Sequence, residues 1–316
     1  MNIDIILTQI VNGLMLGSVY VMVAVAFALV IGMLNFLNFT IPSLFMVSTM
    51  MMWATMSGGF GKKVDGALNA TVGGANKWIV GIFLALIVTA ALSLVIERFT
   101  YRYMKAKYGD ATEHALPLVS SLGFLIIFEH LVIGRWGSDA LTIQSPFGNT
   151  SFYIGTVQFE VPRLASLALS LAIVFLLSLL LKKTRLGRAL RGIAERPDTA
   201  TLMGVEVGRI VPVVYIIAGA LCAIAGVLFT ISYTTIDAYI GDKVATVAIA
   251  GMVLGGLGNI WGAIAGGLFV GVLEALSIHF FGSSVEKVPI WGLLLVILIF
   301  RPTGLFGHTA IGKGKF

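Results

Sequence analysis

The sequence predicts an all-α, polytopic integral membrane protein with about eight or nine transmembrane helices in one domain, residues 1–316. Its 316 residues are 58% hydrophobic and only 11% charged, whereas a soluble domain carries roughly 25% charged residues. Residues 5–61 contain no charged side chain. Because one membrane-spanning helix needs about 20 apolar residues, this first stretch alone is long enough for two helices and a bend.

Nine helical segments are expected along the chain, at residues 6–34, 41–56, 78–96, 115–134, 164–182, 210–232, 244–257, 261–280 and 286–301. The segment 244–257 is short and rich in glycine, so it either spans the membrane or is re-entrant or broken. In the last segment the charge-free run Val288–Phe300 is shorter than a hydrocarbon core about 30 Å thick. Either Lys287 or Arg301 reaches back to the interface, or this helix begins earlier.

Basic residues predict the orientation of the helices. Segments 97–114, 182–209 and the tail after Phe300 hold 14 of the 21 Lys and Arg residues, and strict alternation places all three on one side. The positive-inside rule makes that side the cytoplasm, with the N-terminus outside. Lys62, Lys63 and Lys77 fall on the outer side and oppose this assignment. The net charge of +6 is concentrated in loops, so it indicates membrane orientation and contact with lipid, and no nucleic-acid partner is expected.

The loop 182–209 carries seven Lys or Arg residues between two uncharged segments. Within Thr184–Ala194, apolar residues recur at intervals of three and four, which predicts a short amphipathic helix at the membrane interface. Positive-inside anchoring explains Lys182 and Lys183. The order of the residues that follow favours a surface on which a cytoplasmic protein docks.

A second short helix is expected after the first one. Pro197 ends the amphipathic segment, Asp198 can cap the following turn, and Gly204 can end it. The loop is therefore expected to contain two short helices.

Glycine pairs four residues apart occur mostly in the last third of the chain: Gly251/Gly255, Gly258/Gly262, Gly262/Gly266 and Gly267/Gly271, with Gly13/Gly17 near the start. Small residues at this spacing let helix backbones approach closely. The favoured interpretation is tight packing within one subunit; the alternative is a broken helix that lines a transport pathway.

Ionisable residues inside the apolar segments are few, and charge at membrane depth usually faces a cavity or a partner. Glu129 and His130 lie near the outer end of their segment, where an interfacial or structural role is favoured. Glu274 lies deeper, and both a pathway or gating role and a structural hydrogen bond remain open. Asn35 and Asn38 flank the turn after the first segment and are expected to cap or bend it.

No catalytic, cofactor or metal site is expected. The nearest match to a phosphate-binding loop, Gly307–Gly314, lacks the Ser or Thr after its lysine. One cysteine and four scattered histidines form neither a metal-ligand set nor a nucleophile–base pair.

The loop also carries a resemblance to a known family. Thr184-Arg185-Leu186-Gly187-Arg188-Ala189-Leu190-Arg191, followed by Ala194-Glu195 and Leu202-Met203-Gly204-Val205, resembles the cytoplasmic coupling segment of branched-chain amino-acid ABC permeases of the LivH type. The similarity runs nearly end to end, through Asn12-Gly13-Leu14, Tyr20, Asn38-Phe39, Ile96-Glu97-Arg98, Val253–Ile260, Glu274-Ala275-Leu276 and Arg301–Gly307.

The resemblance implies an importer subunit in a bacterial inner membrane that moves amino acids into the cytoplasm. Its partners would be a second related permease, two cytoplasmic ATP-binding subunits and a periplasmic solute-binding protein. ATP would be hydrolysed on the ATP-binding subunits, so this chain would not be an enzyme.

The resemblance also implies roles for individual residues. Coupling to the ATPase would fall to Arg185, Gly187, Arg188, Arg191, Glu195 and Gly204, and the candidates that line the pathway are Asn12, Tyr20, Asn38, Ser43 and Glu274. Loop 135–163, with Arg135, Asp139, Glu160 and Arg163, either contacts the binding protein or carries ordinary solvated charges.

One departure from the family concerns the substrate. After Asn-Phe the family commonly has a small residue and then His-Gly-Glu, whereas here Thr40 is followed by Ile41-Pro42-Ser43. The solute could therefore be another amino acid, an amide, urea or a related small polar molecule. The alternative class is an ion-coupled secondary transporter, which usually places more acidic residues in its helices than Glu129 and Glu274.

Overall fold

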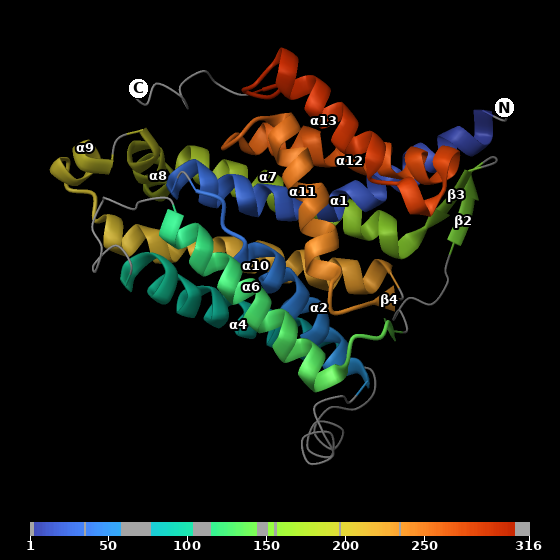
Figure 1. The fold of residues 1–316 in the computed structure, drawn as a ribbon, viewed down its shortest axis with the longest axis horizontal. Helices are drawn as coiled ribbons and strands as arrows, with labels where there is room; N and C mark the ends of the chain where they lie inside the picture. The colour runs from blue at the N-terminus through green and yellow to red at the C-terminus, as the bar shows by residue number, and fades with distance from the viewer. Residues whose placement is uncertain are drawn as a thin grey trace.

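The computed structural model describes residues 3–34, 36–57, 77–103, 115–143, 151–154, 157–195, 197–233 and 235–306. Nine long helices run through this part of the chain (Figure 1), and each coincides with one of the nine predicted segments. They are α1 (Ile3–Leu34), α2 (Thr40–Ser57), α4 (Lys77–Glu97), α6 (Ala115–Trp136), α7 (Val161–Lys183), α10 (Val207–Ser232), α11 (Ile240–Gly255), α12 (Ile260–Phe281) and α13 (Val288–Phe300). The predicted all-α fold class is confirmed.

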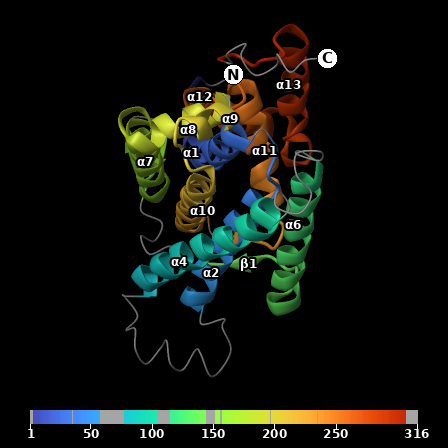
Figure 2. The same ribbon diagram turned by 90° about the vertical axis from the view of Figure 1, so that its left-hand side faces the viewer.

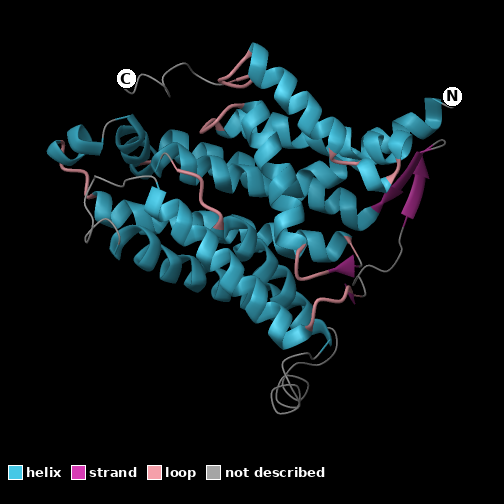
Figure 3. Cartoon of the chain, in the orientation of Figure 1, coloured by secondary structure: helices cyan, strands magenta, loops and turns pink. Residues whose placement is uncertain are grey.

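Short elements join these helices. They are the π-helical turn η2 (Arg98–Arg102), the helices α8 (Arg185–Glu195) and α9 (Pro197–Leu202), the 3-10 turn η4 (Ser283–Val285), and the strands β1 (Leu141–Thr142), β2 (Ser151–Ile154), β3 (Val157–Glu160) and β4 (Thr235–Ile236). β2 and β3 form an antiparallel hairpin, and β1 pairs antiparallel with β4. Figure 3 shows both pairs of strands at the same end of the helices.

Seven of the helical runs are long and apolar enough to cross a membrane: 4–34, 77–97, 116–136, 161–183, 207–232, 260–281 and 283–300. The last run combines η4 with α13, and the α-helix α13 itself begins at Val288. α11 has 16 residues and is about 24 Å long, which is short of a hydrocarbon core of about 30 Å. The segment expected at 244–257 is therefore a short helix.

α1 lies at the centre of the bundle. Every residue from Val19 to Val30 is buried, which fits a helix that is apolar on all sides. α7, α10, α11 and α12 pack around it, and Figure 2 shows α1 among these helices, with α7 on one side and α11 on the other. The core of the protein is thus built around the first helix of the chain.

Glycines allow the closest of these helix contacts. A Cβ at Gly13 of α1 would lie 2.5 Å from the Cα of Val272 on α12, and Gly17 meets Gly271 backbone to backbone. On the other side of α12, Gly262 and Gly266 meet the backbone of Gly255 and Gly251 on α11. The interpretation as tight packing within one subunit is confirmed for these pairs.

The pair Gly258/Gly262 is an exception. Gly258 lies in the turn between α11 and α12 with φ +75°, so it does not share a helix with Gly262. Gly258 nevertheless makes a close backbone contact, because a Cβ at Gly32 of α1 would lie 3.4 Å from the Cα of Gly258. A backbone with positive φ is one that glycine adopts far more readily than other residues.

The two ends of the bundle carry different elements. α1 begins near the β2–β3 hairpin at the right of Figure 1, and α8 and α9 lie at the left. The N-terminal end of α1 and the helices α8 and α9 are therefore at opposite ends of the bundle, as the alternation of helices requires. The basic residues Lys62 and Lys63, and Lys313 and Lys315 of the tail, lie outside the described residues.

Candidate functional site

A tight corner joins α7 to α8. Thr184 separates the two helices, and its hydroxyl donates to the carbonyl of Leu180 (2.6 Å) and accepts from the N–H of Gly187 (3.3 Å). Gly187 is buried directly against the carbonyl of Leu181, where no side chain would fit. The guanidinium of Arg191, one turn further along, donates to that same carbonyl (2.8 Å). Gly187 and Arg191 thus fix the angle at which α8 leaves the bundle.

α8 is amphipathic, as the sequence predicted. Leu190 and Ile193 are buried against the bundle, while Arg185 and Arg188 are exposed. α9 ends at Leu202, Gly204 in the turn that follows has φ +82°, and the N–H of Val205 closes this turn on the carbonyl of Ala200 (3.0 Å). Gly204 therefore has the helix-ending position that its sequence context predicted. The cap expected from the side chain of Asp198 lies outside the described side chains.

The outward faces of α8 and α9 enclose a groove of about 450 Å³. Arg185, Arg188 and Glu195 line it on α8, and Met203 lines it at the end of α9. Met203 is 81% exposed, and its neighbour Leu202 is 87% exposed. Of the six predicted coupling residues, three therefore line this groove, two hold the α7–α8 corner, and Gly204 lies in the turn after α9.

The starts of α2 and α11 meet inside the bundle. Asn38 is 1% exposed, and its side-chain oxygen accepts from the N–H (3.0 Å) and the hydroxyl (2.6 Å) of Thr40. Its amide nitrogen donates to the hydroxyl of Tyr215 on α10 (3.1 Å). Asn38 therefore organises the start of α2, whereas the sequence predicted a cap or bend after α1. Its partner Asn35 lies outside the described residues.

Two further contacts define these helix starts. Ser43, in the first turn of α2, donates to the carbonyl of Thr40 (2.7 Å) and is fully buried. Gly241, in the first turn of α11, lies so close to the carbonyl of Pro42 that a Cβ there would be 2.5 Å away. Irregular backbone at membrane depth is tolerated where protein surrounds it or where it lines a cavity.

Acidic groups lie beside these helix starts. Glu129 of α6 and Asp242 of α11 line the same small recess, together with Pro42 and Gly241. His130 is exposed, and its Nδ1 lies 2.9 Å from the carbonyl of Ile126 in its own helix. The structure therefore separates two neighbours in the sequence: Glu129 faces the helix starts and His130 does not line this recess.

Tyr20 and Glu274 form a second polar cluster between α1 and α12. The side chains of Tyr20 and Glu274 interact electrostatically, and both are buried. The Oε2 atom of Glu274 has no hydrogen-bond partner among the described residues. Asn12 is half-buried two turns away on α1. The five pathway candidates thus fall into two groups, Asn38 with Ser43 and Tyr20 with Glu274 and Asn12.

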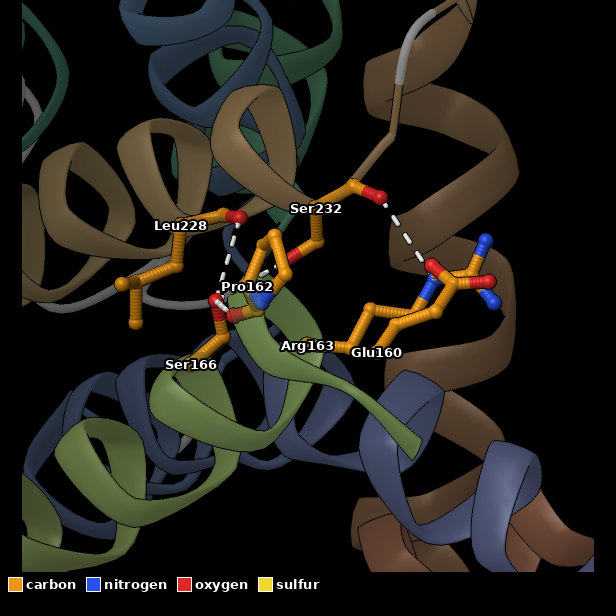
Figure 4. A network of polar contacts seen from close by, with 6 residues as sticks. All are labelled: Glu160, Pro162, Arg163, Ser166, Leu228 and Ser232. Atoms are coloured by element: carbon orange, nitrogen blue, oxygen red, sulfur yellow. Dashed lines mark hydrogen bonds and ion pairs between the residues drawn. The ribbon is translucent and has the colours of Figure 1, made fainter. Parts of the chain in front are cut away.

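The loop between α6 and α7 is anchored where α7 begins (Figure 4). Arg163 pairs with Glu160 (3.0 Å) and points its Nε at the carbonyl of Ser232 (3.5 Å), while its guanidinium lies over the ring of Tyr233. The hydroxyl of Ser166 lies 2.7 Å from that of Ser232. These contacts tie the start of α7 to the end of α10, so Glu160 and Arg163 take part in structural contacts, and Asp139 is exposed.

Sequence reasoning did not identify Tyr215, Ser121 or Asp242 as neighbours of the helix starts. Ser121 of α6 accepts the N–H of Phe39 (3.2 Å). A hydroxyl in a transmembrane helix usually bonds within its own helix, and Ser121 does so with Leu118 (2.7 Å). The sequence holds no signal that the same hydroxyl also receives a backbone donor from a distant turn.

The sequence is similar to known proteins over nearly its whole length. The family model described as "Branched-chain amino acid transport system / permease component" matches residues 9–300. The high-affinity branched-chain amino acid transport system permease protein BraD of Pseudomonas aeruginosa is 31% identical over 316 residues, with 97% of each chain covered. The corresponding protein LivH of Escherichia coli is 29% identical over 315 residues, again with 97% of each chain covered.

A more distant similarity covers part of the chain. The ribose import permease protein RbsC of Bacillus subtilis is 27% identical over 191 residues, which is 58% of each chain. No solved structure matches the chain.

Proposed function

Because this chain belongs to the permease family of branched-chain amino-acid transport systems, we propose that it is a membrane-spanning subunit of an ATP-binding-cassette importer in a bacterial inner membrane. It carries branched-chain amino acids into the cytoplasm. A second related permease, two cytoplasmic ATP-binding subunits and a periplasmic solute-binding protein complete the importer. ATP is hydrolysed on the ATP-binding subunits, the N-terminus is periplasmic and the C-terminus is cytoplasmic.

The observation that carries this proposal is the exposed groove of α8 and α9. Arg185 and Arg188 form no ion pair within the described part of the chain, and Leu202 and Met203 expose apolar surface beside them. A cationic groove with an apolar rim is suited to a protein partner that supplies acidic and apolar groups. The rigid α7–α8 corner then transmits movement of that partner into α7.

The test is charge reversal in the groove. We expect Arg185→Glu with Arg188→Glu to abolish amino-acid uptake and co-purification of the ATPase, while membrane insertion and the melting temperature of the permease stay unchanged. The matched control is Lys183→Glu, because Lys183 is exposed and does not line the groove. Uptake that survives the double change would refute the docking surface.

Arg191→Glu is a separate variant, because Arg191 holds the corner and does not line the groove. We expect it to lower the melting temperature as well as uptake. A loss of uptake with an unchanged melting temperature would instead place Arg191 at the ATPase.

The substrate is tested in proteoliposomes that contain the whole importer. We expect uptake of leucine, isoleucine or valine to require ATP and the loaded binding protein, with the pathway passing Asn38, Ser43 and the Tyr20–Glu274 pair. Uptake of an amide or urea without uptake of these amino acids would show that the substrate is not a branched-chain amino acid. Uptake driven by an ion gradient without ATP would replace the importer with an ion-coupled secondary transporter.

A further inference from the structure

A second pocket lies on the opposite side of α8 from the docking groove. Its volume is about 320 Å³, and α1, α7, α8 and the turn between α11 and α12 enclose it. Apolar side chains such as Leu29, Leu181 and Leu257 form most of the lining. Lys182, Arg191 and Trp261 are its large polar or amphipathic members.

The charged members of this pocket have no protein carboxylate to balance them. The Nζ of Lys182 lies 5.1 Å from the centre of the Trp261 ring. Arg191 donates one N–H to a backbone carbonyl, which leaves other guanidinium donors for an anion. Neither residue forms an ion pair within the described residues. Two positively charged side chains therefore line a mainly apolar cavity without a counter-charge among the described residues.

The place of the pocket in the fold is the membrane interface. Lys182 lies in the last turn of the spanning helix α7, and Trp261 lies in the first turn of the spanning helix α12. Tryptophan and lysine at helix ends are typical of the headgroup region, and an amphipathic helix such as α8 lies in the plane of that region. Trp261 is 46% exposed, so the pocket is accessible from outside the bundle.

We propose that this pocket binds one anionic phospholipid of the surrounding membrane. The phosphate of the headgroup lies between Lys182 and Arg191, and the upper part of an acyl chain lies against α1 and Leu181. Basic pockets between membrane helices are known to hold anionic headgroups. A soluble anion would pair with the two cations but would leave the apolar lining without contacts. An anionic lipid can pair with the cations through its phosphate and contact the apolar lining through its acyl chain.

The experiment uses the full-length permease, purified with its partner subunits in mild detergent. Native mass spectrometry measures the binding of phosphatidylglycerol and of phosphatidylcholine with identical acyl chains. We expect the wild-type protein to bind phosphatidylglycerol selectively, Lys182→Ala to weaken that binding about tenfold, and Lys182→Arg to preserve it. Lys183→Ala is the matched control, because this neighbouring cation is exposed and does not line the pocket.

A second measurement locates the lipid. Phosphatidylglycerol with brominated acyl chains should quench the tryptophan fluorescence of the wild-type protein, and Trp261→Phe should remove that part of the quenching. Equal binding by Lys182→Ala and the wild type would overturn the proposal, as would equal binding of the two lipids. Displacement of the lipid by glycerol phosphate at similar concentration would show that the headgroup alone is recognised and would also overturn it. None of these readouts measures transport or ATP hydrolysis.

Discussion

At the scale of single residues, Gly187 shows how one missing side chain sets the geometry of the coupling loop. A Cβ at this position would collide with the carbonyl of Leu181, which is also the acceptor for Arg191. The residue was chosen from the sequence as a coupling residue, and the structure shows a steric reason for glycine there. In the proposed importer, Gly187 would contribute to coupling through the corner that it permits.

We expect Gly187→Ala to destabilise the permease by about 1–3 kcal/mol, as overpacking does in a closely packed interior. The matched control is Gly192→Ala in the same helix, where the nearest atom to the new Cβ would be 3.8 Å away. That change should be neutral or stabilising by up to about 1 kcal/mol, because alanine favours helix. Thermal unfolding of the purified protein measures both, and equal melting temperatures for the two variants would contradict the steric argument.

Substitutions in the Tyr20–Glu274 pair can distinguish a structural role of Glu274 from a role in transport. Tyr20→Phe removes a hydroxyl that interacts with a buried carboxyl group, and we expect the free energy of unfolding to fall by about 1–3 kcal/mol. Adding Glu274→Met to Tyr20→Phe should restore most of the lost stability, because both polar partners are then replaced by apolar side chains. The pathway role predicts that uptake stays low in the double variant although its melting temperature recovers. Uptake that recovers together with stability would leave Glu274 a structural role only.

At the scale of elements, the turn between α11 and α12 is held by the segment after α13. The N–H groups of Leu305 and Phe306 donate to the carbonyls of Leu254 (2.8 Å) and Gly255 (3.0 Å), the last residues of α11. Asn259 caps α12 by accepting from the N–H of Trp261 (3.0 Å), and its amide donates to the carbonyl of Phe306 (2.9 Å). One side chain therefore links the start of α12 to the end of the chain that the structure describes.

Two substitutions of Asn259 distinguish the contribution of the cap on α12 from that of the hydrogen bond to Phe306. Asn259→Ala removes the cap and the link, and we expect it to destabilise the turn by about 0.5–2 kcal/mol. Asn259→Asp keeps an acceptor at the helix start, where negative charge is favourable, and loses only the donor to Phe306. Hydrogen exchange of residues 254–262 should rise most in the alanine variant and less in the aspartate variant. Equal exchange in both would mean that the link to Phe306 outweighs the cap.

The helices that could be predicted from the sequence are those whose signal is local. Hydrophobic runs predict all nine long helices, and the spacing of apolar residues predicts α8. The start of α11 was placed four residues late, because Gly241 and Asp242 are typical of loops while their helical conformation depends on contact with Pro42. The β2–β3 hairpin and the bond from Asn38 to Tyr215 were missed for the same reason, since each joins groups that only the folded chain brings together.

At the scale of the whole molecule, the two ends of the bundle face different compartments in the proposed importer. The end with α8 and α9 carries five basic residues in the described range 182–195, and the positive-inside rule assigns it to the cytoplasm. The other end carries the β2–β3 hairpin, with Gln158 exposed. The single cysteine of the chain, Cys222, is fully buried. The native protein is therefore a nearly unreactive background for labelling introduced cysteines from either side.

We expect a membrane-impermeant maleimide to label Gln158→Cys in intact spheroplasts, where only the periplasmic side is accessible. Arg188→Cys should be labelled only after the membrane is opened or in inside-out vesicles. The unmodified protein, with only buried Cys222, provides the background in each preparation. The reverse pattern would place α8 outside the cell, away from cytoplasmic ATP, and an ATPase could not then dock on the groove. Because both cysteines lie on exposed positions of elements outside the spanning helices, their labelling reports the sidedness of the bundle and not a local opening of its core.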